Sequence, residues 1–171
     1  YEYHKAKLAI TQKIRLGIYG TSKYKIEIGK IWGTVPYTYL ELHNGNETYF
    51  FSDDAYNLMN YYEFASDQYI SVFWEHHFEG VFFNKVPLFK KLMLREVVGA
   101  KGVYGKLSDK HNSELIIPET TFSLEEPYIE VAVGIENIMT MLRVDAIWRL
   151  THYDNPNVTQ FGVRVKLQPG F

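Results

Sequence analysis

Apolar and polar residues alternate along several stretches of this sequence. Over residues 6–18 the even positions are apolar except for Gln12, whereas the odd positions include Lys7, Lys13 and Arg15. Successive side chains of a β-strand point to opposite faces of a sheet, so this pattern predicts a strand with one apolar and one cationic face. The alternation resumes at Tyr24 after a short turn at residues 20–22, which predicts a β-hairpin.

Five further stretches alternate in the same way, namely residues 69–78, 92–106, 128–135, 142–151 and 161–168. The pattern is least regular in residues 92–106, where Glu96 and Lys101 have opposite parity, and it predicts a β-bulge there. No helix of convincing length is predicted. Most of the predicted strands have about ten residues, which is enough to cross a bilayer as a tilted barrel strand, whereas strands of soluble proteins average about 5–6 residues.

The predicted connections alternate between long and short. If Phe171 lies at the periplasmic end, the connections 33–67, 107–126 and 152–158 lie outside the cell, and those near residues 20–23, 79–90 and 136–138 lie in the periplasm. Long loops outside the cell and mostly short periplasmic turns are typical of outer-membrane barrels. We therefore predict an all-β fold, an antiparallel transmembrane β-barrel. The alternative is a soluble β-sandwich or a lipocalin-like ligand-binding protein, in which the apolar faces point inward.

Composition narrows the possible functions. The 171 residues include 18 basic and 20 acidic side chains, which gives no overall charge that favours a nucleic-acid partner. Cysteine is absent, so disulfides and thiolate chemistry are excluded. No apolar run approaches the ~20 residues of a membrane helix, and the first residues of this sequence do not have the pattern of a signal peptide. The first residue is Tyr1 rather than Met, from which we expect a processed or truncated chain.

Charged residues gather on the polar faces of the predicted strands. Arg143, Asp145 and Arg149 have the same parity, which places them on one face. We expect a salt-bridged network there, rather than a pore that steers anions. The first strand carries a cationic stripe of Lys5, Lys7, Lys13 and Arg15, for which Glu27 and Glu130 are candidate counter-charges.

Other polar clusters have weaker functional interpretations. His76 and His77 point to opposite faces of a strand and cannot share one metal ion, so we expect no metal site there. Asp53 and Asp54 fit a calcium site, but ordinary turn chemistry explains them equally well. Residues 89–92 fit an anchor at the membrane interface or a plain surface turn. No catalytic motif lies on one face, so we expect neither an enzyme nor a cofactor.

The end of the chain resembles an outer-membrane insertion signal, whose residues here are Gln160, Gly162, Val165, Leu167 and Phe171. Together with the segments 36–50, 56–69, 75–105 and 142–156, this run resembles a Bacteroidota outer-membrane family of unknown function. That family has a carboxypeptidase-regulatory-like domain ahead of a surface-antigen-type barrel similar to those of BamA-type assembly factors.

The resemblance implies that residues 1–171 are the C-terminal part of one larger barrel of about sixteen strands, of which this chain supplies seven. It implies that the loop 33–67 folds into the lumen, with Tyr61, Tyr62 and Glu63 against the lumen charges. The Val-Arg-Gly-Phe-like motif of assembly factors is absent from this loop, which argues against insertase activity.

We therefore expect an integral protein of the bacterial outer membrane with a structural, transport or envelope-assembly role. Its expected partners are outer-membrane lipid and lipopolysaccharide, the barrel-assembly machinery during insertion, and other outer-membrane complex subunits.

Overall fold

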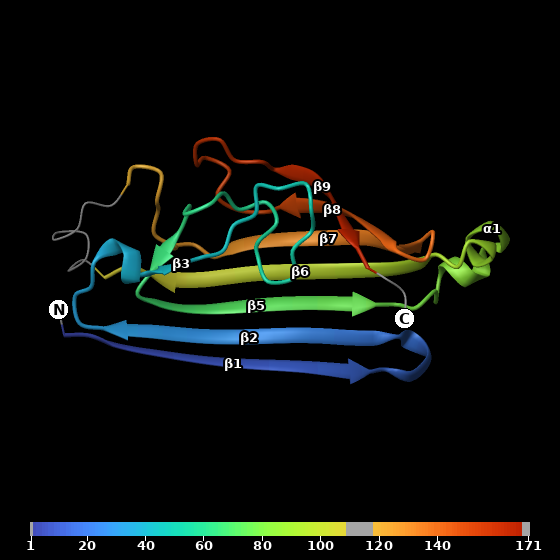
Figure 1. The fold of residues 1–171 in the computed structure, drawn as a ribbon, viewed down its shortest axis with the longest axis horizontal. Helices are drawn as coiled ribbons and strands as arrows, with labels where there is room; N and C mark the ends of the chain where they lie inside the picture. Colours follow the sequence, from blue (N-terminus) through green and yellow to red (C-terminus); the bar gives the residue numbers. More distant parts are fainter. Residues whose placement is uncertain (1, 109–117, 169–171) are drawn as a thin grey trace.

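A single large antiparallel sheet dominates the computed structural model, which describes residues 2–108 and 118–168. Its seven strands pair in the order β1-β2-β5-β6-β7-β8-β9, which is also their order along the chain (Figure 1). Their bounds are β1 His4–Arg15, β2 Thr21–Trp32, β5 Gln68–His77, β6 Arg95–Lys106, β7 Tyr128–Ile138, β8 Leu142–Arg149 and β9 Phe161–Leu167. All seven strands predicted from the alternation are confirmed.

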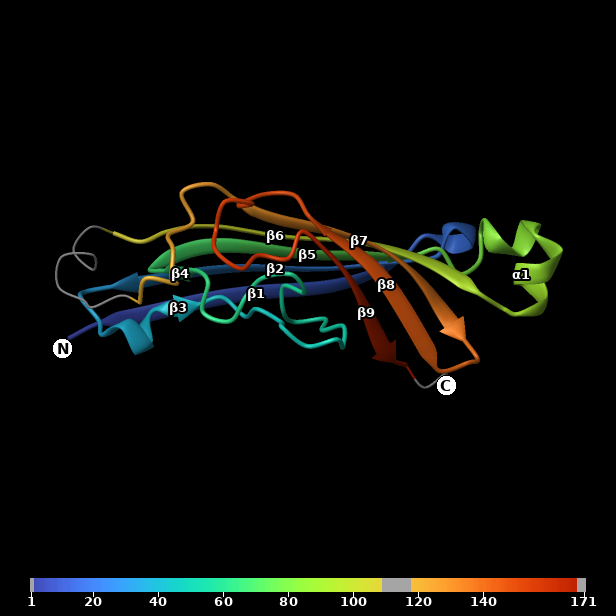
Figure 2. The same cartoon turned by 90° about the horizontal axis from the view of Figure 1, so that it is seen from above.

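The sheet is open among the described residues. β1 and β9 form its two edges, and neither is paired with the other. The fold class is therefore all-β with a mostly antiparallel sheet, and the seven strands do not by themselves close a barrel. The sheet is curved, however, and β8 and β9 turn toward one side of it (Figure 2).

The connections fall at two ends of the sheet, because each strand runs opposite to the one before it. At one end lie a 3-10 turn at Gly17–Tyr19, the connection 78–94 with Phe83–Lys85 and helix α1 (Pro87–Lys91), and the turn 139–141. The predicted turns at 20–22 and 136–137 are thus displaced by a few residues. None of the helices in the described residues is long and apolar enough to span a membrane.

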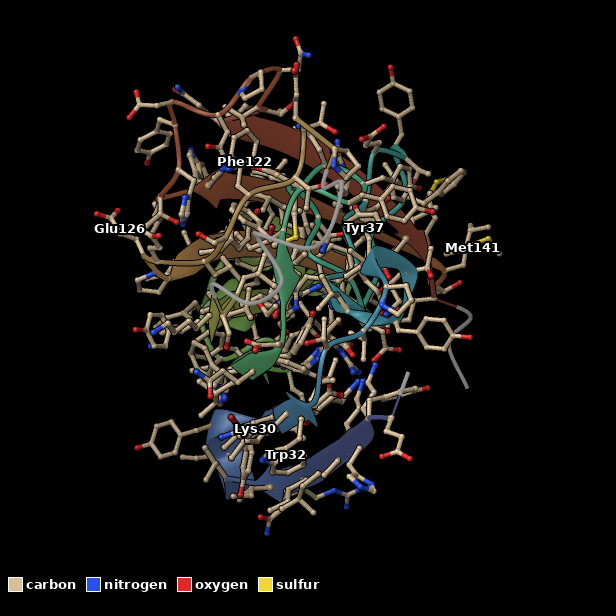
Figure 3. All side chains as sticks on the ribbon, turned by 90° about the vertical axis from the view of Figure 1, so that its left-hand side faces the viewer. Lys30, Trp32, Tyr37, Phe122, Glu126 and Met141 are labelled. Atoms are coloured by element: carbon tan, nitrogen blue, oxygen red, sulfur yellow. The ribbon has the colours of Figure 1, made fainter. Side chains whose placement is uncertain are left out.

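The connection of residues 33–67, which we name the covering segment, lies against one face of the sheet, here the inner face. It contains a 3-10 turn at Tyr37–Tyr39 and the short paired strands β3 (Glu41–Leu42) and β4 (Ala65–Ser66). Viewed along the strands, the sheet curves around this segment (Figure 3). The main apolar core forms where the segment meets the sheet, and consists of Tyr56, Met59, Phe64, Tyr69, Val103, Leu124 and Tyr128.

The opposite face of the sheet, the outer face, is apolar and exposed. The register places its residues in rows that cross the strands. One row begins at Gln12 of β1 and continues through Tyr24, Trp74, Ala100, Val131, Trp148 and Phe161. Large side chains in and beside such rows are well exposed, for example Ile28 at 50%, Val133 at 54% and Leu167 at 64%. The described residues place no second layer over this face.

The bulge predicted in residues 92–106 is wrong. β6 pairs with β5 and β7 without interruption, and the irregular register lies in β7 between Ile135 and Ile138. Glu96 does occupy a position of β6 that faces outward. Its carboxylate, however, accepts hydrogen bonds from the backbone N–H groups of Gly80, Phe82 and Phe83 in the adjoining connection. The carboxylate interrupts the apolar pattern because it stabilises this connection.

Candidate functional site

Charged side chains of the inner face are buried beneath the covering segment. The register places Lys101 opposite Glu130, and Glu130 opposite Arg149. The three residues are 6%, 2% and 1% exposed. Burying a charge is costly unless it is paired and hydrogen-bonded, so the partners of these groups define the site.

Arg149 forms a two-pronged ion pair with Glu63 of the covering segment. Nη2 donates to Oε1 at 2.6 Å and Nη1 donates to Oε2 at 3.0 Å. The guanidinium also donates to the carbonyls of Thr151 and His152, and it lies over the ring of Tyr128, 4.9 Å from its centroid. Two parallel hydrogen bonds between a planar guanidinium and a carboxylate are strong and also fix the relative orientation of the two side chains. The pair therefore holds the segment at a defined position on β8.

Glu130 and Lys101 bind the backbone of the same segment. The Glu130 carboxylate accepts the N–H groups of Asn57 and Leu58 at 2.8 and 3.0 Å, and the Tyr128 hydroxyl at 2.9 Å. The Lys101 ammonium donates to two carbonyl oxygens of the segment, at 2.5 and 2.6 Å. The segment has little regular structure of its own, so these side chains satisfy backbone groups that a strand would otherwise satisfy.

A second buried cluster joins β5, β7 and β8. Arg143 donates to Asp145 at 2.8 Å and to Glu75 at 2.7 Å. Glu75 lies 3.5 Å from His77 Nε2, and His77 Nδ1 lies 2.9 Å from Glu136. The structure thus brings Arg143 and Asp145 together as a pair, but Arg149 belongs to the other cluster. The sequence signals for these further members are the shared parity of Glu75 with His77 and that of Glu136 with Glu130.

Lys13 and Arg15 do not join either cluster. Both side chains lie exposed on the edge strand β1, where Lys13 is directly opposite Lys23, and neither side chain has a hydrogen bond or ion pair within residues 2–108 and 118–168. The rest of the predicted cationic stripe does find partners, because Lys7 pairs with Glu27 at 2.8 Å and Lys5 with Glu41 at 2.9 Å.

The polar turns of the covering segment make protein contacts. Asp53 pairs with Lys166 and Asp54 with Lys25 at the rim of the inner face. His76 contacts the carbonyl of Tyr19 on the outer side. In the described part of the chain, no group of three or more His, Asp or Glu side chains is placed to hold a metal ion.

Of the proposed insertion-signal residues, Gly162, Val165 and Leu167 lie in β9 and Gln160 directly precedes it, whereas Phe171 lies outside the described residues. Gly162 faces inward, where an added Cβ would lie 2.8 Å from Leu58. Val165 exchanges backbone hydrogen bonds with the covering segment at the edge of β9, accepting from Phe51 at 2.9 Å and donating to Tyr49 at 3.0 Å. Leu167 is exposed on the outer face, and Gln160 binds the Arg149 N–H through its carbonyl.

His43 is a buried titratable group in the covering segment. Its ring nitrogen Nε2 lies 3.0 Å from the Ser66 hydroxyl, and its ring packs edge-on against Tyr69. Burial lowers the pKa of His43 to about 4, although Glu41 and Glu27 partly oppose the shift. The imidazole is therefore neutral at physiological pH.

We expect acid to loosen the covering segment through His43. When the segment is open, His43 takes up a proton below the ordinary histidine pKa of about 6.5, whereas in the packed segment it does so only near pH 4. The free energy that keeps the segment packed is therefore complete above about pH 6.5 and is lost as the pH falls. Between about pH 7 and pH 5, the free energy of opening the segment falls by about 2 kcal/mol. Hydrogen exchange of residues 41–46, corrected for intrinsic rates, measures it. His43→Gln removes this dependence, and an equal response in both proteins contradicts the assignment.

Fold and site together define an all-β domain in which a long-stranded antiparallel sheet carries a buried charged face covered by its own connection. A family model described as the C-terminal domain of a family of unknown function (DUF5686) matches residues 1–117, and the chain belongs to this family. Comparison with curated proteins gave no match, and comparison with solved structures gave none either.

Proposed function

We propose that this chain is part of an integral outer-membrane β-barrel with a structural, transport or envelope-assembly role and no catalytic activity. The observation that carries the proposal is the distribution of polarity across the sheet. Charges such as Arg149, Glu130 and Asp145 are buried on the inner face, whereas the outer face presents rows of exposed apolar side chains.

This distribution is the reverse of that in a soluble sandwich, in which the apolar faces of two sheets pack against each other. Here the covering segment lies over the charged face, so the apolar face is left in contact with the surroundings. An exposed apolar patch of this extent marks a surface for lipid or protein. Contact with lipid explains why the apolar surface extends across all seven strands of the sheet.

Strand length supports the same proposal. β1, β2 and β6 have 12 residues each and β5 has 10, which matches the roughly 9–11 residues of a tilted membrane strand. The strands β8 and β9 are shorter, with 8 and 7 residues. At the end with the short turns, α1 carries Lys90 and Lys91 beside the exposed Leu88 and Leu92, a composition suited to the headgroup region.

We further propose that the barrel is of the surface-antigen type, with about sixteen strands, and that the missing strands lie earlier in a longer protein. In this arrangement the inner face lines the lumen and the covering segment fills part of it, with Glu63, Asn57 and Leu58 anchored to the wall. Outer-membrane lipid, lipopolysaccharide and the barrel-assembly machinery are the proposed partners. Because charged groups pin the segment to the wall, the segment favours a closed lumen over an open pore.

Density-gradient fractionation of the parent cells tests the location. The protein is followed with an antibody against markers of the outer membrane, the inner membrane and the soluble fraction. We expect it to migrate with the outer membrane and to resist extraction by high salt, since apolar contact with lipid does not depend on ionic strength. A soluble pool that needs no detergent would overturn the proposal in favour of a sandwich or lipocalin-like protein.

A further inference from the structure

A polar pocket lies where the covering segment meets the connections that follow β6 and β8. Its volume is about 510 Å³, within the range of small-molecule sites. The covering segment contributes Asn60 and Tyr61, and the two connections contribute Phe122 and Asn157. Arg164 of β9 completes the wall on the sheet side.

Arg164 differs from the other buried arginines. Arg143 and Arg149 each bind carboxylates, whereas Arg164 forms no ion pair with any residue that the structure describes. It is only 9% exposed, and its Nε has no hydrogen-bond partner. Its Nη2 donates to the carbonyl of Asn57 at 3.0 Å and its Nη1 to that of Val163 at 3.4 Å, so both of its partners are neutral. An unpaired buried guanidinium is costly, so a ligand that supplies the missing anion gains binding energy from it.

The acidic residues of the pocket do not neutralise Arg164. Glu63 is already bound by Arg149, and Glu47 accepts the N–H of Tyr61 at 2.9 Å from an exposed position. Exposed charges are screened by water and salt, whereas a buried charge acts at low dielectric. The guanidinium therefore sets the preference of the pocket for an anion.

The remaining walls suit a hydroxylated ring. Asn157, Thr120 and Thr159 offer amide and hydroxyl groups, which both donate and accept hydrogen bonds. Tyr61 and Phe122 offer aromatic surface on which the apolar face of a sugar can pack. We propose that this pocket binds an acidic sugar, with the carboxylate or phosphate of the sugar held by Arg164. The proposal goes beyond the membrane role and does not depend on it.

Isothermal titration calorimetry of the purified full-length protein, in detergent if it requires one, tests the site with galacturonate as the probe and galactose as its neutral counterpart. We expect saturable binding of galacturonate and much weaker binding of galactose. Arg164→Gln is expected to weaken the binding of galacturonate about tenfold or more, because a hydrogen-bonded charge is lost. Arg15→Gln, the same change at an exposed arginine outside the pocket, is expected to have no effect.

A second variant separates loss of binding from loss of folding. Thr159→Trp adds bulk at an exposed position of the pocket and leaves Arg164 in place, and it is expected to block galacturonate as well. The proposal is overturned if galacturonate shows no saturable binding at millimolar concentrations, if galactose binds equally well, or if both pocket variants bind like the unmodified protein.

Acidic sugars are available to such a pocket from two sources. Lipopolysaccharide carries them in the membrane, and free sugar acids or sugar phosphates diffuse in solution. If purified lipopolysaccharide displaces bound galacturonate, the result supports the site and indicates that its ligand is an acidic sugar of lipopolysaccharide. Galacturonate binding that lipopolysaccharide does not displace supports the site with a diffusible ligand.

Discussion

Val72→Arg is expected to prevent stable insertion of the protein into the outer membrane. Val72 lies near the middle of β5 on the outer face and is 40% exposed. If this face contacts lipid, an arginine at the bilayer midplane costs about 2–4 kcal/mol. If it contacts water instead, a surface substitution of this kind changes stability by no more than about 0.5 kcal/mol. The amount of folded protein in the outer-membrane fraction, read from its altered gel migration without heating, separates the two cases.

Leu88→Arg is the matched control for this substitution. Leu88 is 61% exposed, but it lies in α1 beyond the ends of the strands, where an arginine reaches the headgroups. We expect Leu88→Arg to insert normally. Equal folding of the two variants would contradict a lipid-facing sheet.

Arg149→Met is expected to free the covering segment from the inner face. The substitution leaves Glu63, which is 2% exposed, without its counter-charge. Removing one partner of a buried ion pair typically costs about 3–5 kcal/mol, because the other charge stays buried and uncompensated. Hydrogen exchange of residues 57–63 is expected to accelerate strongly, while the strands β5 and β6 stay protected.

The double variant Glu63→Met/Arg149→Met tests whether the effect arises from the unpaired charge. Replacing both members by apolar side chains of similar size is often neutral, so we expect the double variant to regain most of the protection. A double variant as open as Arg149→Met alone would show that the packing of the guanidinium on Tyr128, rather than the pairing, holds the segment.

The strands were predictable because their environment differs on the two faces of the sheet. Most outward positions of the strands are apolar, and most of their charged side chains point inward, so the resulting period of two can be read without knowing the partners of a strand. The same reasoning failed at Glu96, whose parity is outward but whose carboxylate binds the backbone of the connection 78–94. A local hydrogen-bonding role leaves no periodic signal, so the sequence pattern at Glu96 indicates a bulge where none exists.

The site was predictable only in part. Parity correctly placed Arg143, Asp145 and Arg149 on one face, but it could not say which carboxylate each arginine binds. Glu63 and Arg149 are 86 positions apart, and their contact depends on how an irregular segment lies across the sheet. Of the three residues of the covering segment expected to contact these charges, Glu63 does so by pairing with Arg149, whereas Tyr61 and Tyr62 lie exposed.

The backbone contact between Val165 and residues 49–51 places the covering segment on the free edge of β9. The N–H and C=O groups of Val165 that point to the free side of β9 are those that a neighbouring strand would use. Any strand that joins β9 along its full length must first displace Tyr49 and Phe51 from this position. The segment therefore competes with any such strand for one stretch of backbone, and in the barrel proposed above a strand could close the sheet at β9 only if the segment moved.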